Sequence, residues 1–110
     1  MNVIFHIDET DKWPTVLSNI KHMVDWYQKT GIQGDIELLI NGEAVKQTVK
    51  TANINLNDIH APNVNMVVCN NSLTQRHISN DDLQEVTSIV PVGVVELALK
   101  QQQGYSYIKA

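Results

Sequence analysis

The chain has 110 residues, of which 43% are hydrophobic and 18% are charged, and it carries one cysteine and a net charge of −4. This length predicts a single domain over residues 1–110, and an acidic chain without a cluster of lysines or arginines is not expected to bind nucleic acid. No apolar stretch is long enough to cross a membrane, the first residues lack a secretory signal pattern, and a lone cysteine forms no internal disulfide. We therefore expect a cytoplasmic protein without a membrane partner.

The first predicted elements are a strand and a long helix. The run Val3–Ile7 is apolar and mainly β-branched apart from His6, which predicts a buried strand. From residue 13 to residue 27, apolar side chains recur at steps of three and four, which predicts an amphipathic helix. We expect Asp11 to cap the start of this helix and Gly31 to end it.

The apolar run Ile36–Ile40 predicts a second strand, which Asn41 and Gly42 close with a strong turn signal. The segment that follows carries no clear period. Residues 44–49 fit either one helical turn or an irregular strand. Residues 51–63 are not assigned to an element, and His60, Ala61 and Pro62 are expected to interrupt regular structure.

The second half of the chain alternates in the same way. Met66–Cys69 predicts a third strand, with a short helix from Leu73 onward. Ser79 is expected to cap another short helix that reaches Leu83, and residues 88–90 predict a fourth strand. A helix from Gly93 to Gln103 and a fifth strand over residues 105–108 complete the pattern.

This alternation predicts an α/β fold with a mostly parallel five-stranded sheet and helices on both faces. Right-handed crossovers favour a doubly wound strand order of 2-1-3-4-5, with the first strand in the centre. In that order, the switch point lies between the first and third strands. The residues beyond those strands would then share one rim of the sheet with two glycine turns: Asp8, Glu9, Cys69, Asn70, Asn41, Gly42, Val92 and Gly93.

Cys69 is the strongest candidate for a chemical role. In open α/β sheets, ligands gather beyond the carboxyl ends of the strands, and Cys69 ends the third one. A helix that begins just after the thiol lowers its pKa, because backbone N–H groups and the helix dipole favour the thiolate. The alternative is that Cys69 packs as a small hydrophobe, as many free cysteines do, and that Asp8 and Glu9 only start a helix.

Several other sites are not expected. No G-x-G-x-x-G motif or phosphate-binding loop is present, so we expect no cofactor. A phosphoacceptor receiver domain needs an aspartate where Cys69 stands. The four histidines share no ligand spacing; His6, Asp8 and Cys69 are the one combination that suggests a metal site, and a hydrogen-bonded core role for His6 is favoured over it.

Two C-terminal segments, Val90–Leu97 and Gln102–Lys109, closely resemble the end of proteins in the DsrE/DsrF-like family. The opening Val3–Asp8 and the turn Cys69–Leu73 are similar to that family too, and the resemblance weakens only over residues 43–63. Within the family, the chain resembles a small uncharacterised branch of the intracellular sulfur-oxidation and sulfur-relay proteins.

The resemblance implies a flavodoxin-like three-layer sandwich that assembles as a homotrimer or homohexamer. Some sulfur-handling relatives carry a cysteine after the third strand that accepts a persulfide, and Cys69 matches that position. Leu73 and Arg76 resemble the helix that follows this cysteine. Asn41 and Gly42 stand where His-Gly is common in this branch.

Two functions remain open on the sequence, and whether the chain is an enzyme is open with them. In the first, Cys69 is a catalytic persulfide carrier that exchanges sulfur with a donor or acceptor protein. Asn70 and Asn71 would supply hydrogen-bond donors, and the other binding candidates are Asp8, Asn41, Gly42 and Gly93. In the second, the chain is a non-catalytic homo-oligomeric scaffold in which Cys69 only packs. The low charged fraction favours an oligomer in both, with contact candidates at His22, Trp26 and residues 105–107.

Overall fold

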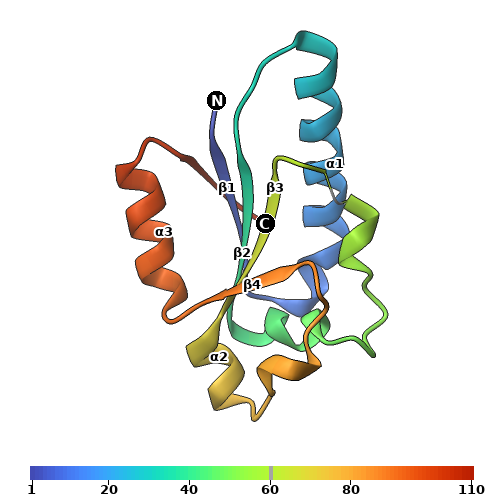
Figure 1. Cartoon of the computed structure of the whole chain (residues 1–110), viewed down its shortest axis with the longest axis vertical. Coiled ribbons are helices and arrows are strands. Elements are labelled where there is room, and N and C mark those ends of the chain that lie inside the picture. The colour runs from blue at the N-terminus through green and yellow to red at the C-terminus, as the bar shows by residue number, and fades with distance from the viewer. Residues whose placement is uncertain (60) are drawn as a thin grey trace.

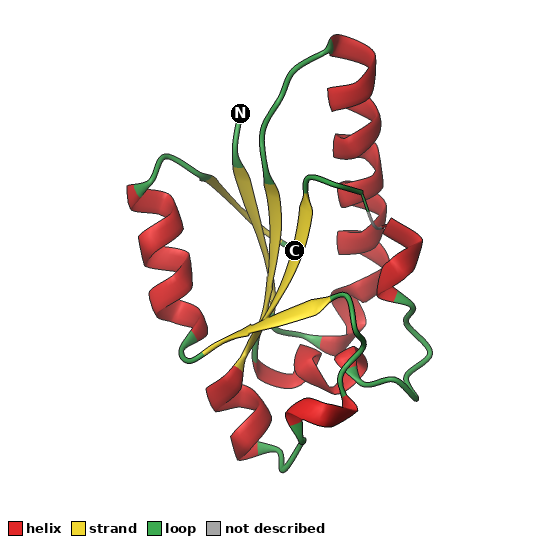
Figure 2. Ribbon diagram, in the orientation of Figure 1, coloured by secondary structure: helices red, strands yellow, loops and turns green. Residues whose placement is uncertain are grey.

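The computed structural model describes residues 1–59 and 61–110, which form a five-stranded parallel sheet flanked by helices (Figure 1). The helices cover both faces of the sheet, so the predicted three-layer α/β sandwich is confirmed (Figure 2). The main elements in chain order are β1 (Val3–Ile7), α1 (Trp13–Thr30), β2 (Ile36–Ile40), β3 (Val64–Cys69), α2 (Asn70–Gln75), β4 (Thr87–Val90), α3 (Gly93–Gln102) and β5 (Ser106–Lys109).

The predicted strand order is wrong. The sheet has the order β4-β3-β2-β1-β5, which makes β2 the central strand and separates β1 from β3. The reason is that the first three connections all pack on one face of the sheet, and right-handed crossovers on one face advance in a single direction. Only the connection through α3 takes the opposite face, so only β5 returns to the far side of β1.

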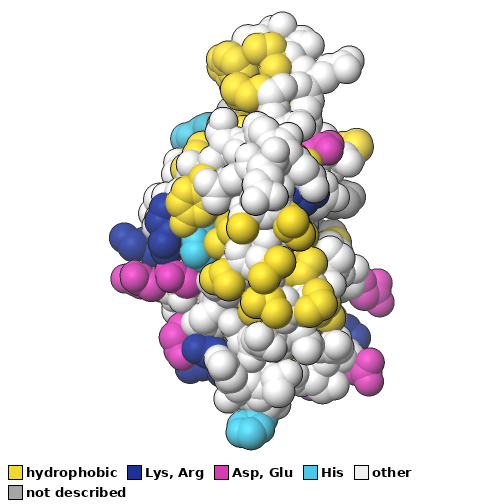
Figure 3. Space-filling model, turned by 90° about the vertical axis from the view of Figure 1, so that its left-hand side faces the viewer, with side chains coloured by type: hydrophobic (Ala, Val, Ile, Leu, Met, Phe, Trp, Pro, Cys, Tyr) yellow, Lys and Arg dark blue, Asp and Glu magenta, His cyan; other side chains and the backbone are white. Residues whose placement is uncertain are grey.

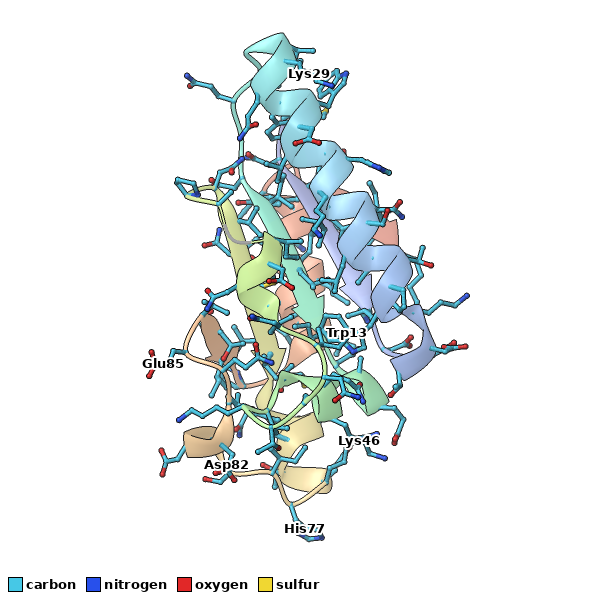
Figure 4. All side chains as sticks on the ribbon, turned by 90° about the vertical axis from the view of Figure 1, so that its right-hand side faces the viewer. Trp13, Lys29, Lys46, His77, Asp82 and Glu85 are labelled. Atoms are coloured by element: carbon cyan, nitrogen blue, oxygen red, sulfur yellow. The ribbon has the colours of Figure 1, made fainter. Side chains whose placement is uncertain are left out.

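The face under α1 holds the larger core. Alternate residues of the three inner strands point to this face, and Trp13, Val16 and Ile20 of α1 pack onto them. Figure 4 shows Trp13 at the start of α1, and its indole N–H donates to the backbone oxygen of Ala44 (3.3 Å). This contact joins the helix to the segment that follows β2.

The ends of α1 fit the prediction in part. Gly31 ends the helix as predicted, with φ of 73° and its N–H donating to the Tyr27 oxygen. Asp11 does not cap the start, because the 3₁₀ turn Thr10–Lys12 runs directly into the helix and makes Lys12 the capping position.

Other boundaries shift by a few residues. β3 begins at Val64, α2 begins at Asn70 rather than at residue 73, and β5 covers Ser106–Lys109. The unassigned segment contains the 3₁₀ helices Gly42–Thr48 and Leu56–Ile59, so the helical alternative for residues 44–49 is correct. Ser79 caps a 3₁₀ turn, as predicted. Of the three residues expected to interrupt regular structure, residue 60 lies outside the described residues, and Ala61 and Pro62 belong to no helix or strand, as predicted.

The opposite face of the sheet is covered by α3 alone among the described elements. Its core is small and consists of Ile4, Leu39, Val67 and Leu97, with Val90 and Tyr105 at its margin. In Figure 3, which views this side, apolar side chains also gather on the outer surface over α3; Val94, Val95 and Leu99 are about half exposed or more. No helix in the described part of the chain is long and apolar enough to span a membrane.

Candidate functional site

Cys69 lies where β3 ends and α2 begins, on the sheet face that α3 covers. Its side chain is only 5% exposed. The backbone N–H of Gly93, the first residue of α3, donates to the Cys69 sulfur over 3.2 Å. The thiol is therefore buried against the start of one helix and at the start of another.

Gly93 permits this close approach. A Cβ atom at this position would stand 3.1 Å from the Cys69 Cβ and 3.2 Å from Leu39 Cδ1. A residue with a side chain would thus push the start of α3 away from the sheet. With glycine there, the N-terminal end of a ten-residue helix faces the sulfur, and the positive end of its dipole favours a thiolate.

Ser72 is a site residue that sequence reasoning missed. It is buried in α2, three positions after Cys69, and its hydroxyl oxygen accepts a hydrogen bond from the Gly42 N–H (2.9 Å). With its lone pair engaged by Gly42, the hydroxyl is free to donate its proton to the thiol. The spacing of three residues at a helix start is the only signal in the sequence, since Gly42 lies 30 positions away.

These contacts decide the pKa of the thiol. Burial, the largest single effect, raises the pKa of Cys69. The Ser72 hydroxyl lowers the pKa most, and the backbone N–H groups of Ser72, Gly93 and Asn71 lower it further. Together these groups outweigh burial, so the pKa of the thiol lies below its ordinary value. The site thus stabilises a thiolate with hydrogen bonds rather than with a cationic side chain.

The two predicted asparagines after Cys69 contribute unequally. Asn71 acts through its backbone N–H, which lowers the pKa of the thiol and also donates to the Pro91 oxygen (3.3 Å). Its side chain is exposed. Asn70 opens α2 and is half-buried.

Asn41 lies beside Cys69 and is held by a histidine. Its side-chain oxygen is 2.8 Å from His6 Nε2, and the other ring nitrogen of His6 is 2.6 Å from the Tyr107 hydroxyl. His6 is thus a hydrogen-bonded core histidine, as the sequence favoured. Among residues 1–59 and 61–110, no group of three or more His, Cys, Asp or Glu side chains is arranged to hold a metal ion.

Asp8 does not lie beside Cys69 as the predicted strand order required, because β2 separates β1 from β3. Its carboxylate instead pairs with Lys109 at the end of β5. The hydrogen bond from Lys109 is the main reason why the pKa of Asp8 lies below its usual value. Asp8 still borders the site through its backbone, since Gly42, with φ of 57°, packs on its oxygen.

Comparison with known proteins agrees with this architecture. Residues 15–110 match the profile of the DsrE/DsrF-like family. A solved protein of unknown function, MTH1491 from Methanobacterium thermoautotrophicum, is similar with a TM-score of 0.88 at 22% identity, covering 99% of this chain and 98% of that one. The ychN protein from E. coli is similar with a TM-score of 0.66 at 14% identity over 100% of both chains. No curated protein matches the chain.

Proposed function

The chain belongs to the DsrE/DsrF-like family, and we propose that it is a sulfur-relay protein in which Cys69 carries a persulfide. The observation that supports this most directly is the set of hydrogen-bond donors around the buried sulfur, which lowers the pKa of the thiol in spite of its burial. A structural cysteine that only fills space in a core does not need such donors. Family membership supports a role in sulfur transfer in general.

The chemistry requires two exchange steps. The Cys69 thiolate attacks the outer sulfur of a donor persulfide, a new S–S bond forms, and the donor leaves as a thiolate that takes up a proton. An acceptor thiolate then attacks the outer sulfur, and the bond to the Cys69 sulfur breaks. The donors from Gly93 and Ser72 stabilise the Cys69 thiolate in both steps, first as the attacking group and then as the leaving group.

A persulfide-loading assay tests the proposal. Incubation with a cysteine desulfurase and cysteine should add about 32 Da, one sulfur atom, to the protein. The variant Cys69→Ser should show no mass gain and should keep its fold. The variant Ser72→Ala should load more slowly at neutral pH, because it removes a hydrogen bond that lowers the pKa of the thiol.

The alternative is an oligomeric scaffold in which Cys69 only packs, and the 5% exposure of its side chain favours it. This function predicts no sulfur adduct and slow labelling of the thiol until denaturant is added. It also predicts that Cys69→Ser is destabilised, because a hydroxyl would enter an apolar pocket. A thiol pKa at or above about 8.5 would support this alternative.

The carrier function carries further expectations about partners and location. A sulfur donor or acceptor protein is the expected partner, and a reducing cytoplasm is the compartment that suits a free reactive thiol. A homotrimer or homohexamer is the expected assembly. Its support is the low charged fraction of 18% and the apolar outer surface of α3.

A further inference from the structure

Four side chains from four strands stand in a row at the carboxyl edge of the sheet, on the face covered by α3. They are Cys69 at the end of β3, Asn41 just beyond β2, His6 in β1 and Tyr107 in β5. Ile40 pairs with Val68, so the next residue on each strand, Asn41 and Cys69, are neighbours. The Asn41 N–H donates to the Ile7 oxygen (3.1 Å), which extends the ladder between β1 and β2 to this point.

The hydrogen bonds along this row have a defined direction. An amide oxygen only accepts, so the 2.8 Å contact requires that His6 Nε2 carries a proton and donates it to Asn41 Oδ1. In the neutral imidazole, Nδ1 then accepts the proton of the Tyr107 hydroxyl over 2.6 Å. His6 is 8% exposed, and its two partners fix both the tautomer and the plane of the ring.

This arrangement determines how the Asn41 carboxamide is turned. Its oxygen faces His6 on the β1 side of β2. The carboxamide nitrogen takes no part in this contact, so its two N–H donors are available to a group on the β3 side of β2, where Cys69 lies. The Cys69 sulfur already accepts a hydrogen bond from the Gly93 N–H on the α3 side, and the Ser72 hydroxyl on the α2 side lowers the pKa of the thiol.

We propose that the Asn41 NH₂ group donates to the outer sulfur of the Cys69 persulfide, and that His6 and Tyr107 are positioning residues that hold Asn41 in this orientation. This inference rests on the proposed carrier function. The outer sulfur of a persulfide is anionic near neutral pH, and a hydrogen bond to a charged group is stronger than one to a neutral group. Asn41 thereby acts on the loaded state, whereas Gly93 and Ser72 act on the free thiolate.

The test loads the protein chemically, without a partner protein. The thiol is converted to its mixed disulfide with thionitrobenzoate, and inorganic hydrosulfide then displaces thionitrobenzoate and leaves the persulfide on Cys69. The pH dependence of alkylation gives the pKa of the free thiol before loading and that of the persulfide after loading. The two values separate effects on Sγ from effects on the outer sulfur.

The variant Asn41→Leu should raise the persulfide pKa by about one unit, which is tenfold in the ratio of anion to acid, and should leave the thiol pKa nearly unchanged. Tyr107→Phe removes one oxygen atom from a side chain that is 40% exposed, so the fold is kept. It should shift the persulfide pKa in the same direction by about threefold in that ratio, because His6 loses one of its two anchors.

Tyr105→Phe is the matched control. Its hydroxyl donates to the Asp35 carboxylate (3.4 Å), which precedes the start of β2 and lies at the end of that strand away from Asn41. The variant should therefore change neither pKa. Equal persulfide pKa values in the wild type and in Asn41→Leu would overturn this inference alone. A wild-type thiol that accepts no sulfur in the folded state would overturn both this inference and the carrier function.

Discussion

Gly93 links the packing of α3 to the chemistry of Cys69. In Gly93→Ala, the added Cβ would lie 3.1 Å from Cys69 Cβ and 3.2 Å from Leu39 Cδ1, so the start of α3 must move away. We expect a stability loss of about 1–2 kcal/mol from overpacking. The thiol pKa should rise, because the N–H···S hydrogen bond lengthens. Urea unfolding and the pH dependence of alkylation measure the two effects.

The control for this variant is Gln102→Ala, at the other end of the same helix. Gln102 is exposed and polar, so neither stability nor the thiol pKa should change much. A Gly93→Ala protein with the thiol pKa of the wild type would contradict the role given to the helix start.

Gln84 lies just before β4 and holds the loop between the 3₁₀ helices Gly42–Thr48 and Leu56–Ile59. Its amide nitrogen donates to the oxygens of Gln47, Val49 and Ile54, and its amide oxygen accepts from the Leu56 N–H. Gln84→Glu would place a carboxylate against three carbonyl oxygens, so we expect a loss of about 1–3 kcal/mol in the free energy of unfolding, measured in urea at neutral pH.

Gln47→Glu makes the same chemical change with a different expected result. The side chain of Gln47 accepts hydrogen bonds through its oxygen, from the Trp13 indole and the Thr10 hydroxyl, and a carboxylate keeps both. The two variants should therefore differ by at least about 1 kcal/mol. Equal unfolding midpoints would mean that the donor side of Gln84 does not hold the loop.

Residues of the site differ in how far the sequence could reveal them. Cys69 was predictable because it ends an apolar run before a helix start. Ser72 was missed because its role depends on the Gly42 N–H, which only the fold brings to it. The pairing of Asp8 with Cys69 was wrong because it was derived from a strand order that placed β1 beside β3.

Among the elements, α3 has an unusual attachment. Glu37 of β2 lies beneath it and is 4% exposed, and one of its carboxylate oxygens has no hydrogen-bond partner within the described residues. Lys100 of α3 approaches the other oxygen to 3.8 Å. Burial is the main cause that raises the pKa of Glu37 to about 7, the negative charge of Glu96 adds to it, and Lys100 opposes it.

This pKa predicts how stability depends on pH. Between the ordinary value of 4.5 and about 7, the folded chain binds a proton at Glu37 that the unfolded chain has lost. This bound proton stabilises the fold by at most about 3 kcal/mol. The stabilisation is fully present below pH 4.5 and is lost as the pH rises through about 7. Glu37→Gln should remove this decrease, so the variant should be more stable than the wild type at pH 8.

Chemical unfolding of both proteins at several pH values from 5 to 8 measures the difference. The two proteins differ only at residue 37, so the difference between their stability curves reports on that side chain. Parallel stability curves for the two proteins would contradict the raised pKa of Glu37.

The elements themselves were largely predictable, and their arrangement was not. The spacing of apolar residues and the positions of turn-forming residues located the five strands and the helices α1 and α3, since both signals are local in the sequence. The strand order depends on which face each connection takes. The segment after β2 has no amphipathic period that indicates a face, and its short 3₁₀ helices pack on the same side as α1.

At the scale of the whole molecule, the outer surface of α3 exposes several apolar side chains to solvent, which is unfavourable. Val94, Val95 and Leu99 are exposed there. Figure 3 shows hydrophobic side chains gathered on this side of the molecule. We expect a homo-oligomer that buries this surface. Val95→Glu should shift the protein toward its 12.4 kDa monomer in sedimentation velocity, because a buried unpaired charge opposes association.

Trp26→Glu is the comparison variant, since Trp26 is 45% exposed on α1, on the opposite side of the sheet. It should leave the assembly intact. Dissociation by Trp26→Glu but not by Val95→Glu would place the contact on α1, and a wild-type protein that sediments only as a monomer at micromolar concentration would exclude an oligomer.

The return of β5 to the side of β1 also has a consequence for the order of folding. His6 pairs with Lys109 in the sheet, so this contact closes nearly the entire chain into a loop. Such distant contacts form late, because the entropy of loop closure opposes them until other structure brings the ends together. During synthesis, β1 therefore keeps one open edge while β2, β3 and β4 can already assemble. The hydrogen bond between His6 and Tyr107 then forms only when the last strand docks, so the row of polar side chains beside Cys69 is complete only in a fully folded chain.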